Sequence, residues 1–389
     1  MTSLIPFTQG FSVAWLVVSA LSVFGKLDLR SPSLHAPLRK TLLIGSGLLL
    51  WIANSPLQFV LGWSGIFLIP LEALWRRSRE TGRGTGTLFS FGFALSTGLI
   101  LSIGVGHPGN AWSFGELGLR EFLVLLTPAL LASGIFPFHL WTAELKKALP
   151  HEEATLFLMA QPGIALLAHS LHALREPLPE GLRWTLVLFF LVNSVYRAGM
   201  GWVRTNYKRA FWNLFFSQSC LVAAGLLAGK LGVVGATLLT WVLLPGFFVL
   251  ARVLEALRKK HGIRKIQGHE GLAKAAPRAN RFFLSLGLLL IGAPGGLAFV
   301  GEDLLFHALL EVSHLAVAGF ILATCINGMV FYRVYSRLFL GHPRPEDPYD
   351  LTPSPHWDIS RRDGILLTLL ILGMLACGLL PGTFLHLFD

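Results

Sequence analysis

Twelve long apolar runs dominate this chain and constrain its fold more than any other feature. A helix needs about 20 mostly apolar residues to cross a bilayer, and these runs approach or exceed that length. Only 14% of the 389 residues are charged, against about 25% in soluble globular domains. This deficit excludes an ordinary soluble enzyme, and it predicts an all-α polytopic membrane protein with about 12 transmembrane helices. The runs cover residues 10–25, 41–54, 56–75, 85–106, 119–138, 152–172, 184–203, 208–229, 232–254, 279–300, 304–332 and 363–386. For the eleventh run, two shorter pieces are the alternative, because Glu311 and His314 interrupt it.

Lysine and arginine gather on alternate connections between these runs. Of the 32 basic residues, 27 follow odd-numbered runs, and such an asymmetry marks the cytoplasmic side of a membrane protein. We therefore predict a bacterial-type inner (cytoplasmic) membrane protein with both termini on the non-cytoplasmic side. The net charge of +11 has the same explanation, so the lipid bilayer is an expected partner and nucleic acid is not.

Two of the runs contain residues that interrupt a helix. Pro137 lies in the first, and Pro294 and Gly295 lie in the second. Proline removes a backbone donor and glycine permits unusual backbone angles, so each run predicts a helix broken at membrane depth, with a plain proline kink as the alternative. Irregular backbone at this depth must be buried in protein or line a wet cavity.

The spacing of the two breaks predicts an internal repeat. They are five runs apart, so residues 41–172 and 184–338 would form two five-helix repeats of inverted orientation, each with a broken helix. Residues 1–40 would add an N-terminal transmembrane helix with a basic loop, and residues 339–389 a loop and a C-terminal helix. Interrupted helices at matching positions of inverted halves indicate an ion-translocation site.

Four motifs carry a family resemblance. They are Phe136-Pro137-Phe138-His139-Leu140-Trp141, Thr205-Asn206-Tyr207-Lys208-Arg209-Ala210 followed by Ser217-Gln218, Gly292-Ala293-Pro294-Gly295 with Phe299-Val300-Gly301-Glu302, and Tyr332-Arg333 with Arg337-Leu338-Phe339-Leu340-Gly341. In this order, the motifs resemble those of the proton-translocating antiporter-like subunits of NADH–quinone oxidoreductase, which are similar to subunits of multisubunit cation/proton antiporters. The resemblance implies a shortened, divergent member that couples proton translocation within a multisubunit respiratory or ion-transport complex, with other membrane subunits as partners.

The chain departs from the family pattern at several positions, most of them in the first repeat. Ser64, Asn206 and the stretches 131–133 and 158–161 stand where the family has ionisable residues. The resemblance therefore implies a degenerate first half-channel, while Glu302 in the second half is retained.

Intramembrane ionisable residues are costly and are functional candidates by default. Glu302 and Asp303 adjoin the second break, and proton transfer needs a carboxyl that titrates near neutral pH, a property that burial confers. The alternative is a carboxylate at a helix end, capped by backbone amides or paired with a partner subunit. His307, Glu311 and His314 are spaced to line one stripe of a helix, which would either continue a hydrated proton path or contact a neighbouring subunit.

Three further residues complete the candidate proton path. His139 is positioned by the first break, where it either transfers protons or hydrogen-bonds the broken backbone. Glu72 is able to replace the lost carboxylate in part, although an ordinary i, i+4 pair with Arg76 is the favoured interpretation. Lys208 begins a run on the basic side, where a snorkelling anchor is the simpler interpretation. Arg197 lies well inside a run and needs a carboxylate, a carbonyl or a wet cavity.

Other functions stay open at this stage. One is a non-conducting structural scaffold. Another is a DabB-type partner of an inorganic-carbon (CO2/bicarbonate) uptake complex, with a carbonic-anhydrase-like soluble subunit in place of a soluble redox subunit. No residue set resembles a catalytic, metal or cofactor site, so the chain would be at most a non-catalytic membrane subunit of a proton-pumping oxidoreductase. Residues 343–356 include five prolines and predict an extended surface loop.

Overall fold

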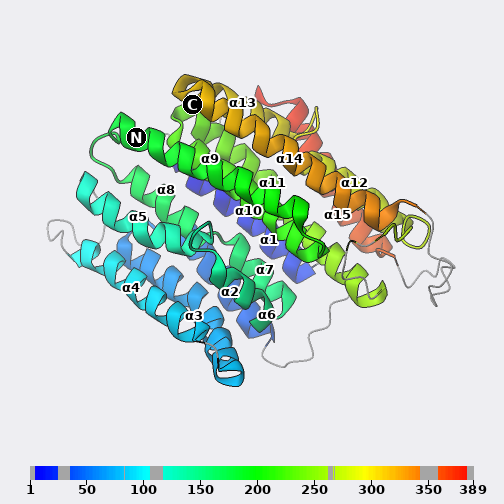
Figure 1. Cartoon of the computed structure of the whole chain (residues 1–389), viewed down its shortest axis with the longest axis horizontal. Helices are drawn as coiled ribbons and strands as arrows, with labels where there is room; N and C mark the ends of the chain where they lie inside the picture. Colours follow the sequence, from blue (N-terminus) through cyan, green and yellow to red (C-terminus); the bar gives the residue numbers. More distant parts are fainter. Residues whose placement is uncertain are drawn as a thin grey trace. The chain divides into compact units, whose positions relative to one another are not determined.

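The computed structural model describes residues 5–24, 36–82, 84–105, 117–261, 266, 268–341 and 358–382, and most of them are helical. The loop predicted at 343–356 lies outside the described residues. Within them, one isolated bridge between Leu117 and Leu174 is the only β-type pairing. The helices are α1 Ile5–Phe24, α2 Ala36–Ile52, α3 Pro56–Thr81, α4 Thr85–Val105, α5 Leu119–Ser133, α6 Leu140–Ala148, α7 His151–Met159, α8 Pro162–His172, α9 Glu180–Val203, α10 Tyr207–Leu227, α11 Lys230–His261, α12 Pro277–Leu290, α13 Leu297–Val312, α14 His314–Phe339 and α15 Arg361–Leu379 (Figure 1).

The chain divides into two compact units. Unit 1 comprises Met1–Ser19 and Arg30–Arg183, and unit 2 comprises Ala20–Leu29 and Trp184–Asp389. Both consist of apolar helices, since a backbone without water must satisfy its hydrogen bonds internally. The fold is therefore that of an all-α polytopic membrane protein.

Unit 1 is built around α2, α3 and the α7–α8 pair. Helix α3 packs against α2 and α4, and α5 packs against α8. Two tryptophans tie the helices together: the Trp51 indole donates to the Ala160 carbonyl at 2.9 Å, and the Trp15 indole donates to the Ile44 carbonyl at 3.0 Å. Because buried indole N–H groups need partners, these contacts fix the helices as well as filling the core.

Unit 2 is built around α10 and α11. Every residue of the most apolar window of α10 is buried, whereas only 28% of that of α15 is, so α10 is a central helix and α15 a peripheral one. Helix α10 begins at the Asn206 cap, whose side-chain oxygen accepts from the Arg209 backbone N–H at 3.1 Å. Asn206, a departure from the family pattern, thus has a structural role as a helix cap.

Both predicted breaks are present. The first separates α5 from α6, and the second separates α12 from α13. The eleventh predicted run, 304–332, follows its alternative interpretation and is divided between two helices, because α13 ends at Val312 and α14 begins at His314. Between them Ser313 is extended and its hydroxyl accepts from the Ala316 backbone N–H at 3.1 Å, capping α14.

The number of membrane spans stays a prediction. Eight helical segments within the described residues are long and apolar enough to cross a membrane by themselves. The broken helices do not meet this length criterion, because each half is too short alone. The predicted count of twelve is therefore not established by helix length.

Candidate functional site

The second break places a carboxylate next to irregular backbone. Helix α12 ends at Leu290, and α13 starts at Leu297. Gly292 adopts a φ of +74°, in the left-handed region, where a side chain is strained. The Ala293 backbone N–H donates a hydrogen bond to the Leu288 carbonyl at 3.0 Å. The chain therefore turns out of one helix and into the next without losing this backbone bond.

Glu302, on the second turn of α13, points back at this break. Its carboxyl occupies the space where a Cβ on Gly292 would be, so only glycine fits beside it. Gln218 on α10 lies within hydrogen-bonding reach of the carboxyl. The second oxygen, Oε1, is buried and has no hydrogen-bond partner among the described residues. A carboxyl with an open acceptor site, held beside a helix break, is suited to accept and release a proton.

Close packing of α11 and α13 fixes the position of Glu302. A Cβ on Gly301 would lie 3.0 Å from the Gly235 carbonyl oxygen, so the two helix backbones are in contact at this point. Gly301 immediately precedes Glu302, and any larger residue there would push α13 outward. The residues behind the carboxyl are apolar: Val222, Leu239, Leu243 and Ala298 line a narrow space next to Gln218.

The predicted stripe below Glu302 faces outward. The side chains of Asp303 and His307 are 58% and 56% exposed, and they form an ion pair at 3.7 Å when the histidine is protonated. Glu311 is also exposed. The prediction that His314 belongs to the same helical stripe is wrong, because it opens α14 after the chain has changed direction at Ser313. Glu302 alone of this group turns toward the packed interior.

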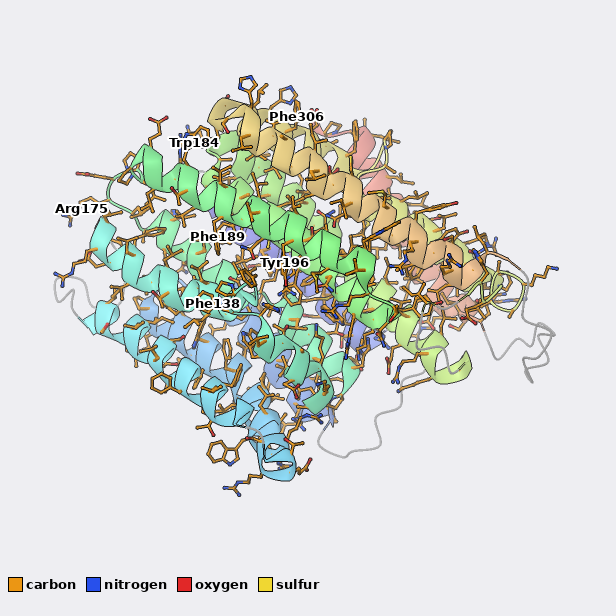
Figure 2. The ribbon with its side chains drawn as sticks, in the orientation of Figure 1. Phe138, Arg175, Trp184, Phe189, Tyr196 and Phe306 are labelled. Carbon is orange, nitrogen blue, oxygen red and sulfur yellow. The ribbon has the colours of Figure 1, made fainter. Side chains whose placement is uncertain are left out.

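The first break holds a histidine in place of a carboxylate. Gly134 ends α5 with a φ of +65°, and His139 precedes the first residue of α6. The Trp141 indole donates across the break to the Leu131 carbonyl at 3.1 Å. His139 is half-buried, with Phe136 and Phe138 beside it 50% and 37% exposed (Phe138 is labelled in Figure 2).

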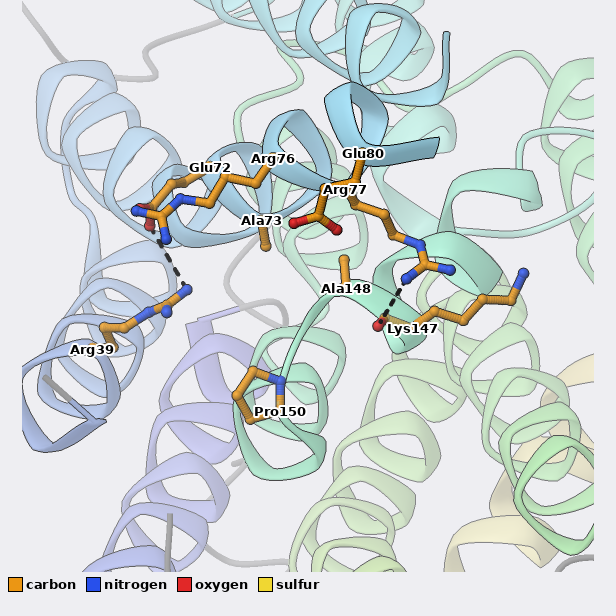
Figure 3. A pocket seen from close by; sticks show the side chains of 9 residues that line it. All are labelled: Arg39, Glu72, Ala73, Arg76, Arg77, Glu80, Lys147, Ala148 and Pro150. Atoms are coloured by element: carbon orange, nitrogen blue, oxygen red, sulfur yellow. Dashed lines mark hydrogen bonds and ion pairs between the residues drawn. The ribbon is translucent and has the colours of Figure 1, made fainter. Parts of the chain in front are cut away.

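Glu72 belongs to a set of ion pairs rather than to a break. Its carboxylate lies 2.5 Å from Arg76, as the i, i+4 spacing predicts, and 3.8 Å from Arg39 on α2. These residues line a cavity of about 250 Å³ with Arg77, Glu80 and Lys147 (Figure 3). In the figure, the Glu72 carboxylate points at the two arginines and away from the helix axis of α3.

Sequence reasoning missed the acidic partners of this cluster. Glu152 and Glu153, in the first turn of α7, are 8% and 3% exposed. Lys40 lies 2.5 Å from Glu152, and Arg39 lies 3.3 Å from Glu153. Carboxylates in the first turn of a helix are a common pattern, so this signal alone did not indicate pairing with α2.

The cations of unit 2 differ in their surroundings. Lys208, in the first turn of α10, is half-buried and interacts electrostatically with Glu255 on α11. Arg197 is 5% exposed and donates to the Asn213 side-chain oxygen at 3.2 Å, with its guanidinium 4.9 Å from the centre of the Phe216 ring. The carbonyl partner that the sequence required for Arg197 is thus the side-chain amide oxygen of an asparagine.

Comparison with known proteins places the chain in a family. The model of the transmembrane region of NADH:quinone oxidoreductase and Mrp antiporter proteins matches residues 53–327. Subunit N 3 of NADH-quinone oxidoreductase from Streptomyces griseus is 26% identical over 275 residues, covering 68% of this chain and 48% of that protein. Subunit N 1 from Acidiphilium cryptum is 26% identical over 355 residues, covering 88% and 66%. The chain thus spans about half to two thirds of the length of these relatives.

Solved structures share the fold. A chain of respiratory complex I from Thermus thermophilus aligns with a TM-score of 0.78 at 21% identity, covering 96% of this chain and 82% of that one. A chain of the Mrp complex from Dietzia aligns with a TM-score of 0.77 at 17% identity, covering 100% and 82%. With the family model matching most of its length, this chain belongs to the NADH:quinone oxidoreductase/Mrp antiporter transmembrane family.

Proposed function

We propose that this protein is a membrane subunit that carries protons through Glu302 at the second break, within a multisubunit complex of the respiratory or Mrp antiporter type. The observation that carries the proposal is the Glu302 carboxyl, which is held against Gly292 with one buried oxygen unpartnered among the described residues. Such a group offers one oxygen as a free acceptor for a proton donor, while Gln218 lies within hydrogen-bonding reach of the carboxyl.

The chemistry needs no cofactor in this chain. Glu302 takes up a proton on one oxygen and gives it to a water or polar group on the opposite side. The interrupted helix allows this exchange, because its free backbone groups tolerate water where an intact helix would exclude it. Energy for directional transport would come from partner subunits, and other membrane subunits are the first partners to expect.

The first half-channel, by contrast, is proposed to be degenerate. Ser64 and Asn206 replace ionisable residues, and Asn206 caps α10. The carboxylates Glu72, Glu152 and Glu153 are paired with arginine or lysine, which favours a structural role. This observation also supports the second candidate, a scaffold that keeps the fold for assembly without conducting.

We further propose a bacterial-type inner membrane location with both termini outside the cytoplasm. The alternation of basic connections along the sequence supports this orientation. Partner identity would come from affinity purification: flavin or iron–sulfur subunits would support a respiratory complex. A zinc-containing soluble subunit would instead support the inorganic-carbon alternative.

The proposal is tested by replacing Glu302 with glutamine. The complex is purified with its accompanying subunits and reconstituted in proteoliposomes, and proton flux is followed with a pH-sensitive dye. We expect Glu302→Gln to lower the flux about tenfold or more, since positioned acid–base groups typically contribute at least that much to proton transfer.

Asp303→Asn is the matched control, because it removes a neighbouring carboxylate that is 58% exposed. Its flux should stay close to that of the unmodified complex. If Glu302→Gln conducts normally while the complex stays assembled, the role of Glu302 is rejected and the scaffold function is preferred.

A further inference from the structure

Three helices of unit 2 meet at Gly201 on α9. A Cβ there would lie 3.3 Å from Val330 on α14 and 3.4 Å from the Ala210 carbonyl oxygen on α10. Helix α9 therefore packs closely against both α10 and α14 at this level of the core.

The directions of these helices follow from their contacts. Ser194 pairs with Ser217 and Arg197 with Asn213, so α9 and α10 run antiparallel. In contrast, Gly319 on α14 faces Leu191 on α9, as Val330 faces Gly201, so α9 and α14 run parallel.

One helical turn from Gly201, the same three helices contribute a polar layer. Arg197 is four residues before Gly201, Asn213 is three residues after Ala210, and Asn327 is three residues before Val330. Steps of three or four residues keep the same face of a helix. With the helix directions above, Arg197, Asn213 and Asn327 therefore share one layer of the core, which we call the polar layer.

The polar layer contains a side-chain amide that makes no hydrogen bond to the described residues. Asn327 is 0% exposed, and neither its side-chain nitrogen nor its oxygen has a hydrogen-bond partner among the described residues. Buried polar groups are normally paired with protein or with ordered water. A leucine of similar volume would avoid the free-energy cost of burying an unpaired amide. The asparagine therefore indicates a hydrogen-bond partner other than protein.

The polar layer also lies in a column along α10. Asn213 donates to the Arg209 carbonyl at 3.0 Å, and one turn further on, the Ser217 hydroxyl lies 2.9 Å from that of Ser194. Gln218, beside Ser217, reaches Glu302. Polar groups thus recur at each turn from the basic start of α10 to the carboxyl at the second break.

We propose that Arg197, Asn213 and Asn327 bind buried water, and that this water links the basic start of α10 with Glu302. The asparagine amides donate to and accept from the water, while the guanidinium donates to it and keeps its own protons. Each water takes up one proton and passes one on, so the chain is unchanged after a transfer. The binding of water is independent of the proposed function, whereas its part in proton movement rests on that function.

The test replaces Asn327 with leucine in the purified complex and measures thermal stability, hydroxyl-radical labelling and proton flux. Water bound beside Arg197 would generate radicals next to Phe216, which is only 4% exposed. We expect Phe216 to be labelled in the unmodified protein well above its neighbour Phe215, which is 0% exposed. In Asn327→Leu this labelling and the flux should fall, and Tm should drop by about 2–4 °C.

Two further variants keep the test interpretable. Asn327→Ser leaves a polar group and room for water, so it should retain labelling and most of the flux even if the leucine variant fails to fold. Thr240→Val is the control, since this fully buried hydroxyl donates to the Ala236 carbonyl of its own helix. Labelling and flux in this variant should not change.

The polar layer is dry, and the proposal wrong, if Asn327→Leu raises Tm and leaves labelling and flux unchanged. Loss of flux in Glu302→Gln with normal Asn327→Leu overturns the polar layer alone. Normal flux in Glu302→Gln with lost labelling in Asn327→Leu overturns the proposed function and leaves the bound water standing.

Discussion

The two broken helices share a backbone feature but differ in the side chains next to it. Each has a glycine in the left-handed region, Gly134 in the first break and Gly292 in the second. Next to the second lies Glu302, turned inward with an unpartnered oxygen among the described residues. The first break instead presents His139 and two exposed phenylalanines. The backbone feature alone therefore does not set the chemistry of a break, since the first holds a half-buried histidine and the second a carboxyl that turns inward.

Charged residues are distributed in a matching way. In unit 1, Arg39 and Lys40 each form an ion pair with a carboxylate at the start of α7. In unit 2, Arg197 is bound by an asparagine and an aromatic ring, and Glu302 faces Gln218. The difference is that Arg39 and Lys40 join α2 to α7 through ion pairs, whereas Arg197 and Glu302 face side-chain amides.

Gly292→Ala provides the strongest challenge to this comparison. Both Gly292→Ala and Gly134→Ala place a side chain in the left-handed region, which costs about 1–2 kcal/mol. Only the former also displaces the Glu302 carboxyl, so it should additionally lower proton flux about tenfold. Flux in proteoliposomes and Tm are measured for both. Equal flux loss in the two variants would show that the breaks are functionally equivalent.

The cluster of ion pairs in unit 1 gives the next largest effect, on stability alone. Glu153→Gln leaves Arg39 without this buried partner, and breaking a buried pair typically costs about 3–5 kcal/mol. The Arg39 side chain is 29% exposed, so water solvates part of the charge that loses its partner. We therefore expect the free energy of unfolding to fall by about 1–3 kcal/mol. Denaturation monitored by intrinsic fluorescence measures the loss.

Proton flux should remain normal in the Glu153→Gln complex that stays folded. Glu80→Gln is a comparison on the same cavity, and it should change stability less because Glu80 is exposed. A strong loss of flux at unchanged stability would instead assign a conducting role to unit 1 and contradict the proposal that the first half-channel is degenerate.

The sequence predicted the elements that depend on local composition. Glycine and proline residues located both breaks, and hydropathy located the helices. Helix α11 is longer than predicted, because basic turns extend it to His261, past the apolar run that ended at 254. The split at Ser313 was only indicated as an alternative, since a serine cap does not interrupt hydropathy. Likewise, Gln161 interrupts α7–α8 with a φ of +47°, and only the proline that follows it hinted at this.

The site was predictable in its residues but not in its geometry. Glu302 stood out because it follows a break, yet helical spacing alone did not decide which of Glu302 and Asp303 turns inward. The packing of Gly301 against Gly235 decides it. Pairs such as Arg39 with Glu153 join residues more than 100 positions apart, and periodicity along one helix carries no information about such contacts.

The smallest expected effect concerns pH and the end of the first broken helix. Glu144 in α6 lies beyond the apolar run 119–138, in the basic connection that follows it. The hydrogen bond from Lys147, at 2.6 Å, and the charge of Arg77 lower the pKa of Glu144 below its ordinary value of 4.5. A lowered pKa stabilises the fold above the unfolded value, and this stabilisation is lost as pH falls through the folded value.

Glu144→Gln should therefore lower stability by about 0.2–1 kcal/mol near neutral pH, as expected for a partly exposed pair. The difference from the unmodified protein should shrink as pH falls below 4.5, because protonation removes the charge that the substitution removes. Tm measured across this range in lipid nanodiscs checks the prediction, with Asp303→Asn as the control, since the 3.7 Å pair of Asp303 with His307 is exposed. A difference that grows in acid would show that Glu144 is held in its neutral form, and unit 1 would then contain a protonated carboxyl like the one proposed for the second break.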